Sequence, residues 1–177
     1  MKNFTKMAAL AVMMFGFALT SNAQNTATSA STDASATIVA PITISAGSLL
    51  SFGQVVASGT AGEVILAPAG TRTAQNGVSF SAGVTGSPSA SAFTVTGETG
   101  YTYTVTLPAS IELAGTTGAA LAATASMTVD TFTKSIGTGD LSVDGTEDFT
   151  VGATLHVGAN QATGAYEGTY TVKVDYQ

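Results

Sequence analysis

The stretch Tyr166–Tyr176 (YEGTYTVKVDY) decides the fold class, because its side chains alternate in character without a break. One parity carries aromatic, branched or small residues, namely Tyr166, Gly168, Tyr170, Val172, Val174 and Tyr176. The other parity carries the polar residues Glu167, Thr169, Thr171, Lys173 and Asp175. A period of two places every second side chain on one face of a strand, whereas a helix repeats about every 3.6 residues. The stretch is therefore predicted to be one half-buried β-strand.

The same alternation recurs upstream in short segments that are separated by turn residues. Further strands are predicted at 37–45, 49–56, 63–66, 78–82, 92–96, 101–107, 125–133 and 148–157. Turns are predicted at 57–60, 76–77, 97–100, 137–140, 144–145 and 158–164. The alanine-rich segment 114–125 is predicted to be a loop, because Gly115 and Gly118 interrupt it. Short strands without helical spacers predict an all-β, immunoglobulin-like antiparallel β-sandwich.

The first 23 residues are predicted to be a signal peptide that is cleaved after Ala23. Two lysines precede an uncharged run of 13 residues, 7–19, and small residues follow it. This run is shorter than the roughly 20 residues that a membrane-spanning helix needs. Residues 24–36 are predicted to be a flexible leader rich in Ser, Thr and Ala, and residues 37–177 a single β-sandwich domain. The protein is accordingly expected to be exported, to the periplasm, the cell surface or the medium, with no transmembrane helix in the mature chain.

Composition excludes several classes of partner. Without the signal peptide, 3 basic residues face 11 acidic ones, a formal charge of −8, and Arg72, Lys134 and Lys173 are far apart in sequence. Nucleic acid is not an expected partner, because phosphate binding needs clustered basic side chains. The chain has no cysteine, which excludes disulfides, thiolate metal sites and cysteine nucleophiles. Pro41 cannot donate a ladder hydrogen bond, so its strand is predicted to lie at a sheet edge.

The sequence shows no recognisable set of catalytic residues. His156 is the only histidine. The apolar residues of strand 148–157 have odd numbers, so His156 is predicted to lie with Thr150 and Thr154 on the opposite, solvated face. A catalytic base or metal ligand needs convergent partners, which the sequence does not indicate. We therefore predict a non-enzymatic protein with no catalytic, cofactor-binding or metal-binding residues.

Three other groups of residues are candidates for a site. Asp140, Asp144, Glu147 and Asp148 form the densest acidic cluster, for which a solvated hairpin is favoured over weak calcium binding. The segment 137–139 has the glycines of a nucleotide loop but no following helix. Tyr101, Tyr103, Val105 and Leu107 share one parity and are predicted to be core rather than a sugar-stacking platform.

Several stretches, taken in order, resemble a known family. They are 37–44 (TIVAPITI), 50–53 (LSFG), 100–108 (GYTYTVTLP), 151–155 (VGATL) and 164–176 (GAYEGTYTVKVDY). Together they resemble a bacterial family of exported proteins known only as a domain of unknown function, which is distantly similar to spore coat protein U and the archaic chaperone–usher pilins. The resemblance implies an immunoglobulin-like sandwich that assembles into surface fibres by strand donation. The expected donor is 36–46, because the leader before Ala34 offers only alanines as apolar side chains.

These observations favour an exported, non-enzymatic structural or interaction protein, such as a subunit of a surface fibre or matrix that self-associates or joins other fibre subunits. The alternative is a monomeric secreted module that binds glycan or protein through loops such as 83–90 or 158–164. A third alternative is an outer-membrane β-barrel, although most predicted strands are shorter than the roughly nine to eleven residues that a spanning strand needs.

Overall fold

The computed structural model describes residues 28–80, 86–136 and 139–177. The chain divides into two units, Met1–Thr37 and Ile38–Gln177. Residues 28–37 are exposed and contain no helix or strand. The predicted signal peptide, residues 1–23, and the first residues of the predicted leader lie outside the described residues. All regular secondary structure of the described residues therefore belongs to the second unit.

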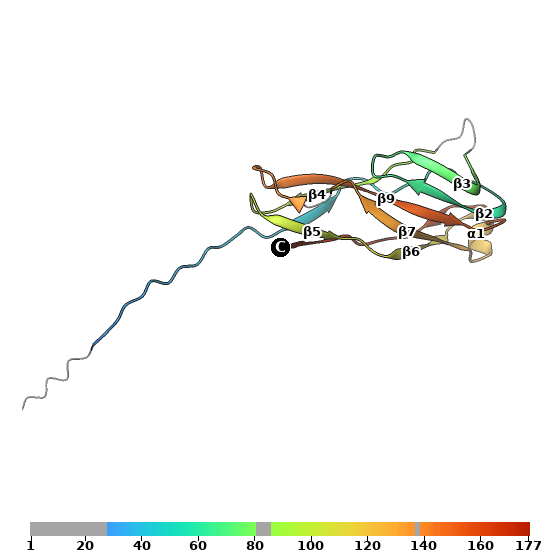
Figure 1. The fold of residues 1–177 in the computed structure, drawn as a ribbon. Coiled ribbons are helices and arrows are strands. Elements are labelled where there is room, and N and C mark those ends of the chain that lie inside the picture. Colours follow the sequence, from blue (N-terminus) through green and yellow to red (C-terminus); the bar gives the residue numbers. More distant parts are fainter. Residues whose placement is uncertain (1–27, 81–85, 137–138) are drawn as a thin grey trace, which may run out of the picture. The chain divides into compact units, whose positions relative to one another are not determined.

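The regular secondary structure of the second unit is almost entirely antiparallel strand, which confirms the predicted all-β, sandwich-like fold (Figure 1). The strands are β1 (Thr43–Ala46), β2 (Val56–Leu66), β3 (Arg72–Ser79), β4 (Ser91–Thr96), β5 (Thr102–Thr106), β6 (Ser110–Gly115), β7 (Ser126–Lys134), β8 (Gly139–Asp140), β9 (Thr146–Val157), β10 (Tyr166–Glu167) and β11 (Lys173–Tyr176). One short helix, α1 (Gly118–Ala122), lies between β6 and β7. No helix of the described ranges is long and apolar enough to cross a membrane.

The long strand β9 organises the larger sheet, whose strand order is β1-β4-β9-β7-β6-β10. Its first half pairs with β4 up to Val151, and its second half pairs with β2 from Ala153 onward. Strand β7 lies along the opposite edge of β9 and pairs with it between Val151 and His156. Gly152 is the residue at which β9 changes partner. Strand β1 lies at the sheet edge, as the proline in its predicted segment indicated.

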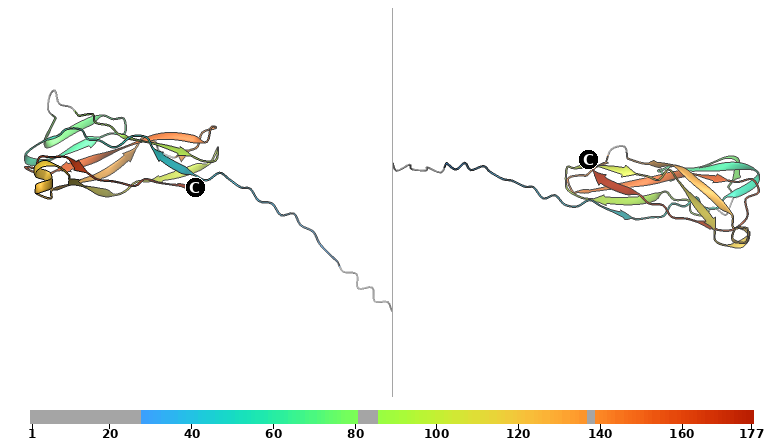
Figure 2. Two further views of the ribbon diagram at one scale, coloured as in Figure 1. Left: turned by 180° about the vertical axis from the view of Figure 1, so that it is seen from behind. Right: turned by 90° about the horizontal axis from the view of Figure 1, so that it is seen from below.

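A smaller sheet, of order β11-β5-β8, forms the other layer at one end of the sandwich. In Figure 1 and the left view of Figure 2, β5 and β6 run along one side and β4 and β9 along the other. Strand β11 pairs with β5, and β10 pairs with β6. Because β6 also pairs with β7, the larger sheet continues from one layer into the other.

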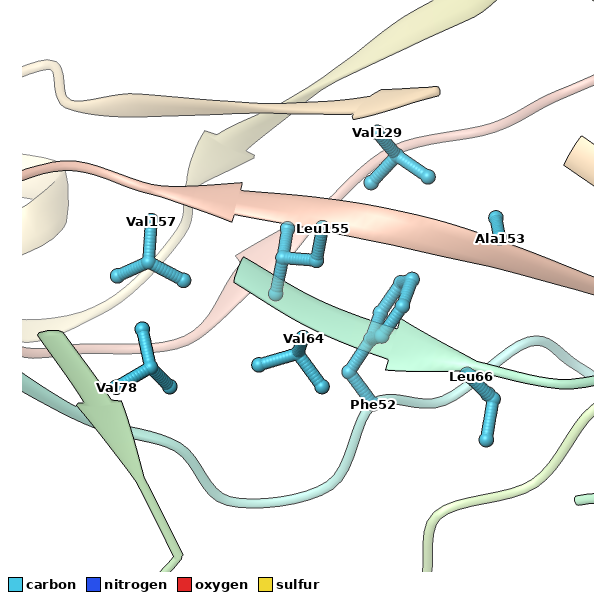
Figure 3. Packing of buried hydrophobic residues seen from close by; sticks show 8 residues of the cluster. All are labelled: Phe52, Val64, Leu66, Val78, Val129, Ala153, Leu155 and Val157. Atoms are coloured by element: carbon cyan, nitrogen blue, oxygen red, sulfur yellow. The ribbon is translucent and has the colours of Figure 1, made fainter. Parts of the chain in front are cut away.

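The first hydrophobic cluster lies between β2, β3, β7 and β9 (Figure 3). Its buried members are Phe52, Val64, Leu66, Val78, Val129, Ala153, Leu155 and Val157. Phe52 belongs to the loop before β2. Arg72 holds this loop, because its Nη1 donates hydrogen bonds to the carbonyl oxygens of Phe52 (2.6 Å) and Gln54 (3.1 Å). The guanidinium also lies 3.7 Å from the ring centre of Phe80, so this arginine closes one side of the cluster.

The second hydrophobic cluster lies between the first half of β9 with its neighbour β4 and the smaller sheet. Its buried members are Val95, Tyr103, Leu141, Phe149 and Val151. Ile42, Ile44, Val174 and Tyr176 are half-buried and pack against it. The N-terminal segment and the C-terminal strand thus cover the same cluster.

The stretch Tyr166–Tyr176 keeps its predicted alternation of burial, except at the exposed Gly168, but is not one strand. Only its two ends form ladders, as β10 and β11, and these belong to different sheets. Between them, the Tyr170 hydroxyl contacts the Ser91 hydroxyl, and the Tyr170 ring lies 5.2 Å from that of Phe132. The prediction of a continuous strand is wrong, because the middle of the stretch packs by side chains where the chain passes from one sheet to the other.

Two predicted turns are also wrong, because they lie inside strands, and the last two residues of a third predicted turn, 137–140, form β8. Residues 57–60 belong to β2 and residues 76–77 to β3. The β2–β3 ladder shifts its register between Ala57 and Gly62, and Asn76 has a positive φ of 59°. A Cβ on Gly77 would lie 1.8 Å from the carbonyl oxygen of Thr60. The turn-forming residues therefore serve a bulge between paired strands.

The predicted loop 114–125 contains α1, which corrects that prediction. Ala120 of this helix is fully buried, and a Cβ on Gly115 would lie 2.5 Å from its carbonyl carbon. The glycine that seemed to exclude a helix instead permits close packing of one. The predicted strand 49–56 forms only an isolated bridge, from Ser51 to Ser89, before β2 begins. Strand β6 was not predicted.

Candidate functional site

The acidic cluster predicted from sequence does not converge on one point. Glu147 Oε2 accepts hydrogen bonds from the Tyr103 hydroxyl (2.8 Å) and the Asp140 backbone N–H (3.1 Å). Asp148 follows Glu147 in β9 and bonds Thr94 Oγ1 (2.6 Å) on the other face. Asp144 lies in the turn after β8, where its N–H donates to Ser142 Oγ (3.3 Å). Across the ranges that the structure describes, no group of three or more histidine or acidic residues is arranged to hold a metal ion.

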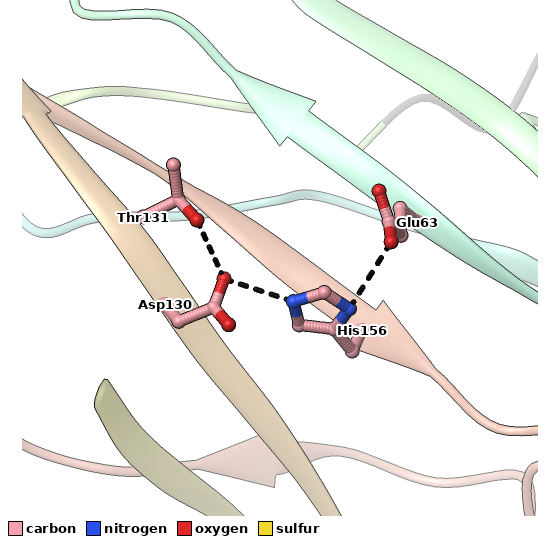
Figure 4. Close-up of polar contacts among 4 residues, drawn as sticks. All are labelled: Glu63, Asp130, Thr131 and His156. Atoms are coloured by element: carbon pink, nitrogen blue, oxygen red, sulfur yellow. Dashed lines mark hydrogen bonds and ion pairs between the residues drawn. The ribbon is translucent and has the colours of Figure 1, made fainter. Parts of the chain in front are cut away.

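His156 lies between two carboxylates on the polar face of the larger sheet (Figure 4). Its Nδ1 is 3.4 Å from Glu63 Oε1, and its Nε2 is 2.8 Å from Asp130 Oδ1. Glu63 comes from β2 and Asp130 from β7, the two neighbours of β9. The face of His156 was predicted correctly, but Thr154, which was predicted to be solvated on the same face, is only 7% exposed. The two carboxylate partners were not predicted, because they are remote from His156 in the sequence.

The two ring nitrogens determine what this site can do. They lie on opposite edges of the imidazole, so the two carboxylates cannot converge on one cation. When both nitrogens carry protons, the ring donates to both carboxylates and links three strands; a neutral ring can donate to only one. The side chains are 36–40% exposed. Exposed pairs of this kind contribute at most about 1 kcal/mol, so we interpret the site as a cross-strand electrostatic link.

His156 also changes the acidity of Asp130. Its hydrogen bond is the largest cause that lowers the pKa of the Asp130 carboxyl, and the hydrogen bond from Thr131 Oγ1 (2.9 Å) adds to it. A carboxyl with a lowered folded-state pKa stabilises the fold above its ordinary pKa. This contribution is lost as the pH falls through the lowered value.

Replacement of His156 by alanine should raise the pKa of Asp130 towards the ordinary range of aspartate, because the largest lowering contact is removed. A carbon-detected NMR titration of the Asp130 carboxyl measures this shift. Glu63→Gln is the matched control, because Glu63 contacts the other nitrogen and leaves the Asp130 contact in place. An unchanged Asp130 titration in His156→Ala would contradict the assignment.

Three of the four residues of the predicted stripe, Tyr103, Val105 and Leu107, face the second cluster as predicted. Tyr103 is 1% exposed, and Val105 is half-buried. Burial raises the pKa of the Tyr103 hydroxyl, and its hydrogen bond to Glu147 raises it further. The ring also covers Gly139, whose Cβ position would lie 2.4 Å from the Tyr103 Cζ. Tyr101, at the start of the stripe, is 40% exposed and stands edge-on to Tyr176.

The N-terminal segment Ile38–Ala46 occupies an edge site on the domain. Residues 43–46 pair with β4, and Ile42 and Ile44 pack on the second cluster. Ile38 is 95% exposed. Ahead of Pro41, Ala40 bonds the side chains of Glu98 and Tyr176 through its backbone N–H and carbonyl oxygen. Sequence reasoning identified this segment but missed the two side chains that hold it, which come from a turn and from the C-terminal strand.

One of the two loops weighed as a ligand site is bound to the domain by its own side chains. In the loop 158–164, Gln161 accepts a hydrogen bond from the Gly158 N–H (3.1 Å) and donates to the Ser126 carbonyl oxygen (3.2 Å). It also donates to the Tyr166 hydroxyl (2.8 Å). The other loop, 83–90, lies partly outside the described residues. The side-chain amide of Gln161 is therefore already bound to atoms of the protein itself.

Comparison with known proteins gives one family. The family model described as "Domain of unknown function (DUF4402)" matches residues 42–176, which is most of the chain and nearly all of the second unit. The search of curated proteins and the search of solved structures return no match. The matched range begins at Ile42, inside the N-terminal segment, and ends at Tyr176. With its sandwich-like β-fold and a match of this extent, the chain belongs to the DUF4402 family.

Proposed function

We propose that the protein is an exported, non-enzymatic structural subunit that self-associates by exchange of its N-terminal strand, residues 36–46. Export rests on the signal-peptide pattern of residues 1–23. The similarity to pilin-like proteins noted in the sequence is part of the same proposal. Its main support is the way in which the N-terminal segment binds its own domain.

The segment binds as a separable edge element. Strand β1 has four residues and one ladder neighbour, β4. Its side chains alternate: Ile42 and Ile44 face the second cluster, and Thr43 and Ser45 bond the backbone carbonyls of β4. Each of these contacts joins the segment to the rest of the domain. The same segment from a second copy can therefore make every one of them, which is the requirement for strand exchange.

In the described chain the segment fills its own edge site. A donor used in this way leaves no open groove for a neighbour, so assembly requires the segment to leave its own domain first. Departure exposes the β4 edge and the apolar surface beneath Ile42 and Ile44, and a neighbour's segment covers both again. The proposed assembly is thus an exchange between closed domains.

The alternative of a glycan-binding module has less support. A polar depression of about 380 Å³ lies beside His156 and is lined by Glu63, Asn76 and Thr128, among others. Glycan sites generally use an exposed aromatic ring for stacking. The most exposed aromatic residue of the described ranges, Tyr101, is not among those that line the depression.

Cysteine cross-linking tests strand exchange, because the chain has no cysteine of its own. Ser45 and Thr94 lie opposite each other in the β1–β4 ladder. We expect Ser45→Cys in one copy and Thr94→Cys in a second, differently tagged copy to become linked by a short thiol-specific cross-linker after mixing. The product is a heterodimer that denaturing electrophoresis resolves by mass.

A second pair of positions controls for random collision. Glu63 and His156 are also opposite residues, but in the central β2–β9 ladder, which exchange of the N-terminal segment leaves intact. Glu63→Cys mixed with His156→Cys should give only background heterodimer. Equal yields from the two mixtures would overturn the proposed exchange.

A further inference from the structure

Ala40 is held on both of its backbone polar groups by side chains. Its N–H donates to Glu98 Oε2 (2.8 Å), and its carbonyl oxygen accepts from the Tyr176 hydroxyl (2.9 Å). The Tyr176 hydroxyl in turn accepts a hydrogen bond from the Glu98 backbone N–H (2.6 Å). Three hydrogen bonds thus join Ala40, Glu98 and Tyr176.

This arrangement replaces a ladder pair. In an antiparallel sheet, a hydrogen-bonded residue exchanges both its N–H and its carbonyl with one partner residue. The residue before a proline is confined to extended conformations, in which these two groups point to the same side. Pro41 has no N–H, and the β1–β4 ladder begins only at Thr43. The carboxylate of Glu98 and the hydroxyl of Tyr176 supply Ala40 with the acceptor and the donor that a strand would otherwise supply.

Neighbouring residues build the site around Tyr176. A Cβ on Gly97 would lie 2.3 Å from the Tyr176 hydroxyl oxygen, so a glycine is needed at that position. The Tyr176 ring packs on the second cluster and stands edge-on to Tyr101, with ring centres 5.6 Å apart. The Gly97 N–H donates to the Gly145 carbonyl oxygen (2.9 Å), which ties the turn that carries Glu98 to the β8–β9 connection.

We propose that Glu98 and Tyr176 form a recognition site for an extended segment, in which they bind the backbone N–H and carbonyl oxygen of the residue that precedes a proline. This site sets the register in which the N-terminal strand docks. The ligand is residues 38–46, from the same copy or from a second one; the second case rests on the proposed strand exchange. With Ala40 held, Ile42 and Ile44 face the second cluster. A shift by one residue would turn Thr43 and Ser45 inward, which the apolar cluster disfavours.

Hydrogen exchange on the full chain tests this site. Tyr176→Phe keeps the ring and removes the hydroxyl, and Glu98→Ala removes the carboxylate. We expect the β1 amides to exchange roughly fivefold faster in either variant, as loss of one net hydrogen bond predicts. Glu98→Gln is the matched control, because its amide oxygen still accepts from the Ala40 N–H, so β1 should exchange at the wild-type rate. The amides of Ala153–Val157, in the centre of β9, report global unfolding and should be unaffected.

The outcomes separate this site from the proposed exchange. Unchanged β1 exchange in Tyr176→Phe, or equal acceleration in Glu98→Ala and Glu98→Gln, would overturn the recognition site. Faster exchange confined to β1 supports it, because a general loss of stability would also accelerate β9. If β1 behaves as expected and the Ser45→Cys and Thr94→Cys copies still give only background cross-linking, the recognition site stands within one copy and strand exchange between copies fails.

Discussion

Replacement of Gly152 by alanine should destabilise the domain by more than about 4 kcal/mol, which is exceptional for a single methyl group. A Cβ at this position would lie 2.1 Å from the carbonyl oxygen of Leu66 and 2.8 Å from the backbone N of Pro68. Both obstacles are backbone atoms, so no side-chain rotation relieves the overlap. The end of β2 passes this closely because β9 changes partner at Gly152, from β4 to β2. Urea unfolding followed by circular dichroism measures the loss.

Two other glycines provide matched controls for this substitution. A Cβ on Gly47 would lie 3.7 Å from its nearest neighbour, and one on Gly59 would lie 3.8 Å from its nearest neighbour, which are ordinary contact distances. Gly47→Ala and Gly59→Ala should therefore change stability by no more than about 1 kcal/mol. If Gly152→Ala unfolds at the same urea concentration as these controls, the close approach of β2 and β9 is not a feature of the folded protein.

Phe149→Ala should lower the free energy of unfolding by about 3–5 kcal/mol, the usual cost of a buried phenylalanine. Phe149 is 1% exposed and lies in the second cluster. Its ring stacks on that of Phe93, its opposite residue in the β4–β9 ladder, with centres 5.4 Å apart. Truncation leaves a cavity between the two sheets, where the ladders on either side limit collapse. Chemical denaturation of the purified variant measures the effect.

Leu121→Ala tests whether burial causes this loss. Leu121 is 57% exposed on α1, so the same kind of truncation should cost less than about 1 kcal/mol. Phe149→Leu keeps most of the apolar volume and should fall between the two. A loss for Phe149→Ala no larger than that for Leu121→Ala would contradict the assignment of Phe149 to a packed core.

Side-chain alternation proved a reliable guide to faces and a poor guide to strand ends. In β9, the odd-numbered residues from Phe149 to Val157 are all buried, as the pattern predicts, although the even-numbered Gly152 and Thr154 are buried as well. In Tyr166–Tyr176 the pattern is equally clear, yet the ladder is interrupted at residues 168–172. Alternation reports which side faces apolar atoms, and it does so whether or not the backbone pairs with a neighbour. Where the chain passes between sheets, half-buried side chains remain and the ladder stops.

Turn residues misled the sequence analysis at the β2–β3 bulge. Asn76 and Gly77 are typical of a two-residue hairpin, and both lie within a paired strand. A bulge uses the same backbone freedom as a turn, and only the position of the partner strand distinguishes them. The partner contacts at Thr60, some 17 residues earlier, are not readable from local composition.

The candidate sites were less predictable than the fold, because they depend on pairs that are distant in sequence. His156 meets Asp130 and Glu63 only after β7, β9 and β2 have paired. Ala40 and Tyr176 are 136 residues apart and come together because both ends of the domain cover the second cluster. No local spacing carries either arrangement. The local alternation of Ile42 and Ile44 identified the segment, but it did not identify the side chains that hold it.

Strand β9 contributes Phe149 and Val151 to one hydrophobic cluster and Ala153, Leu155 and Val157 to the other. If one cluster unfolded, β9 would also lose the position from which it packs against the other cluster. Both clusters should therefore unfold in a single cooperative transition. A domain built in this way should respond to heat or to mechanical force as one cooperative unit. Its tolerance for inserted residues should accordingly be confined to the connections at its two ends and be absent from the shared strand.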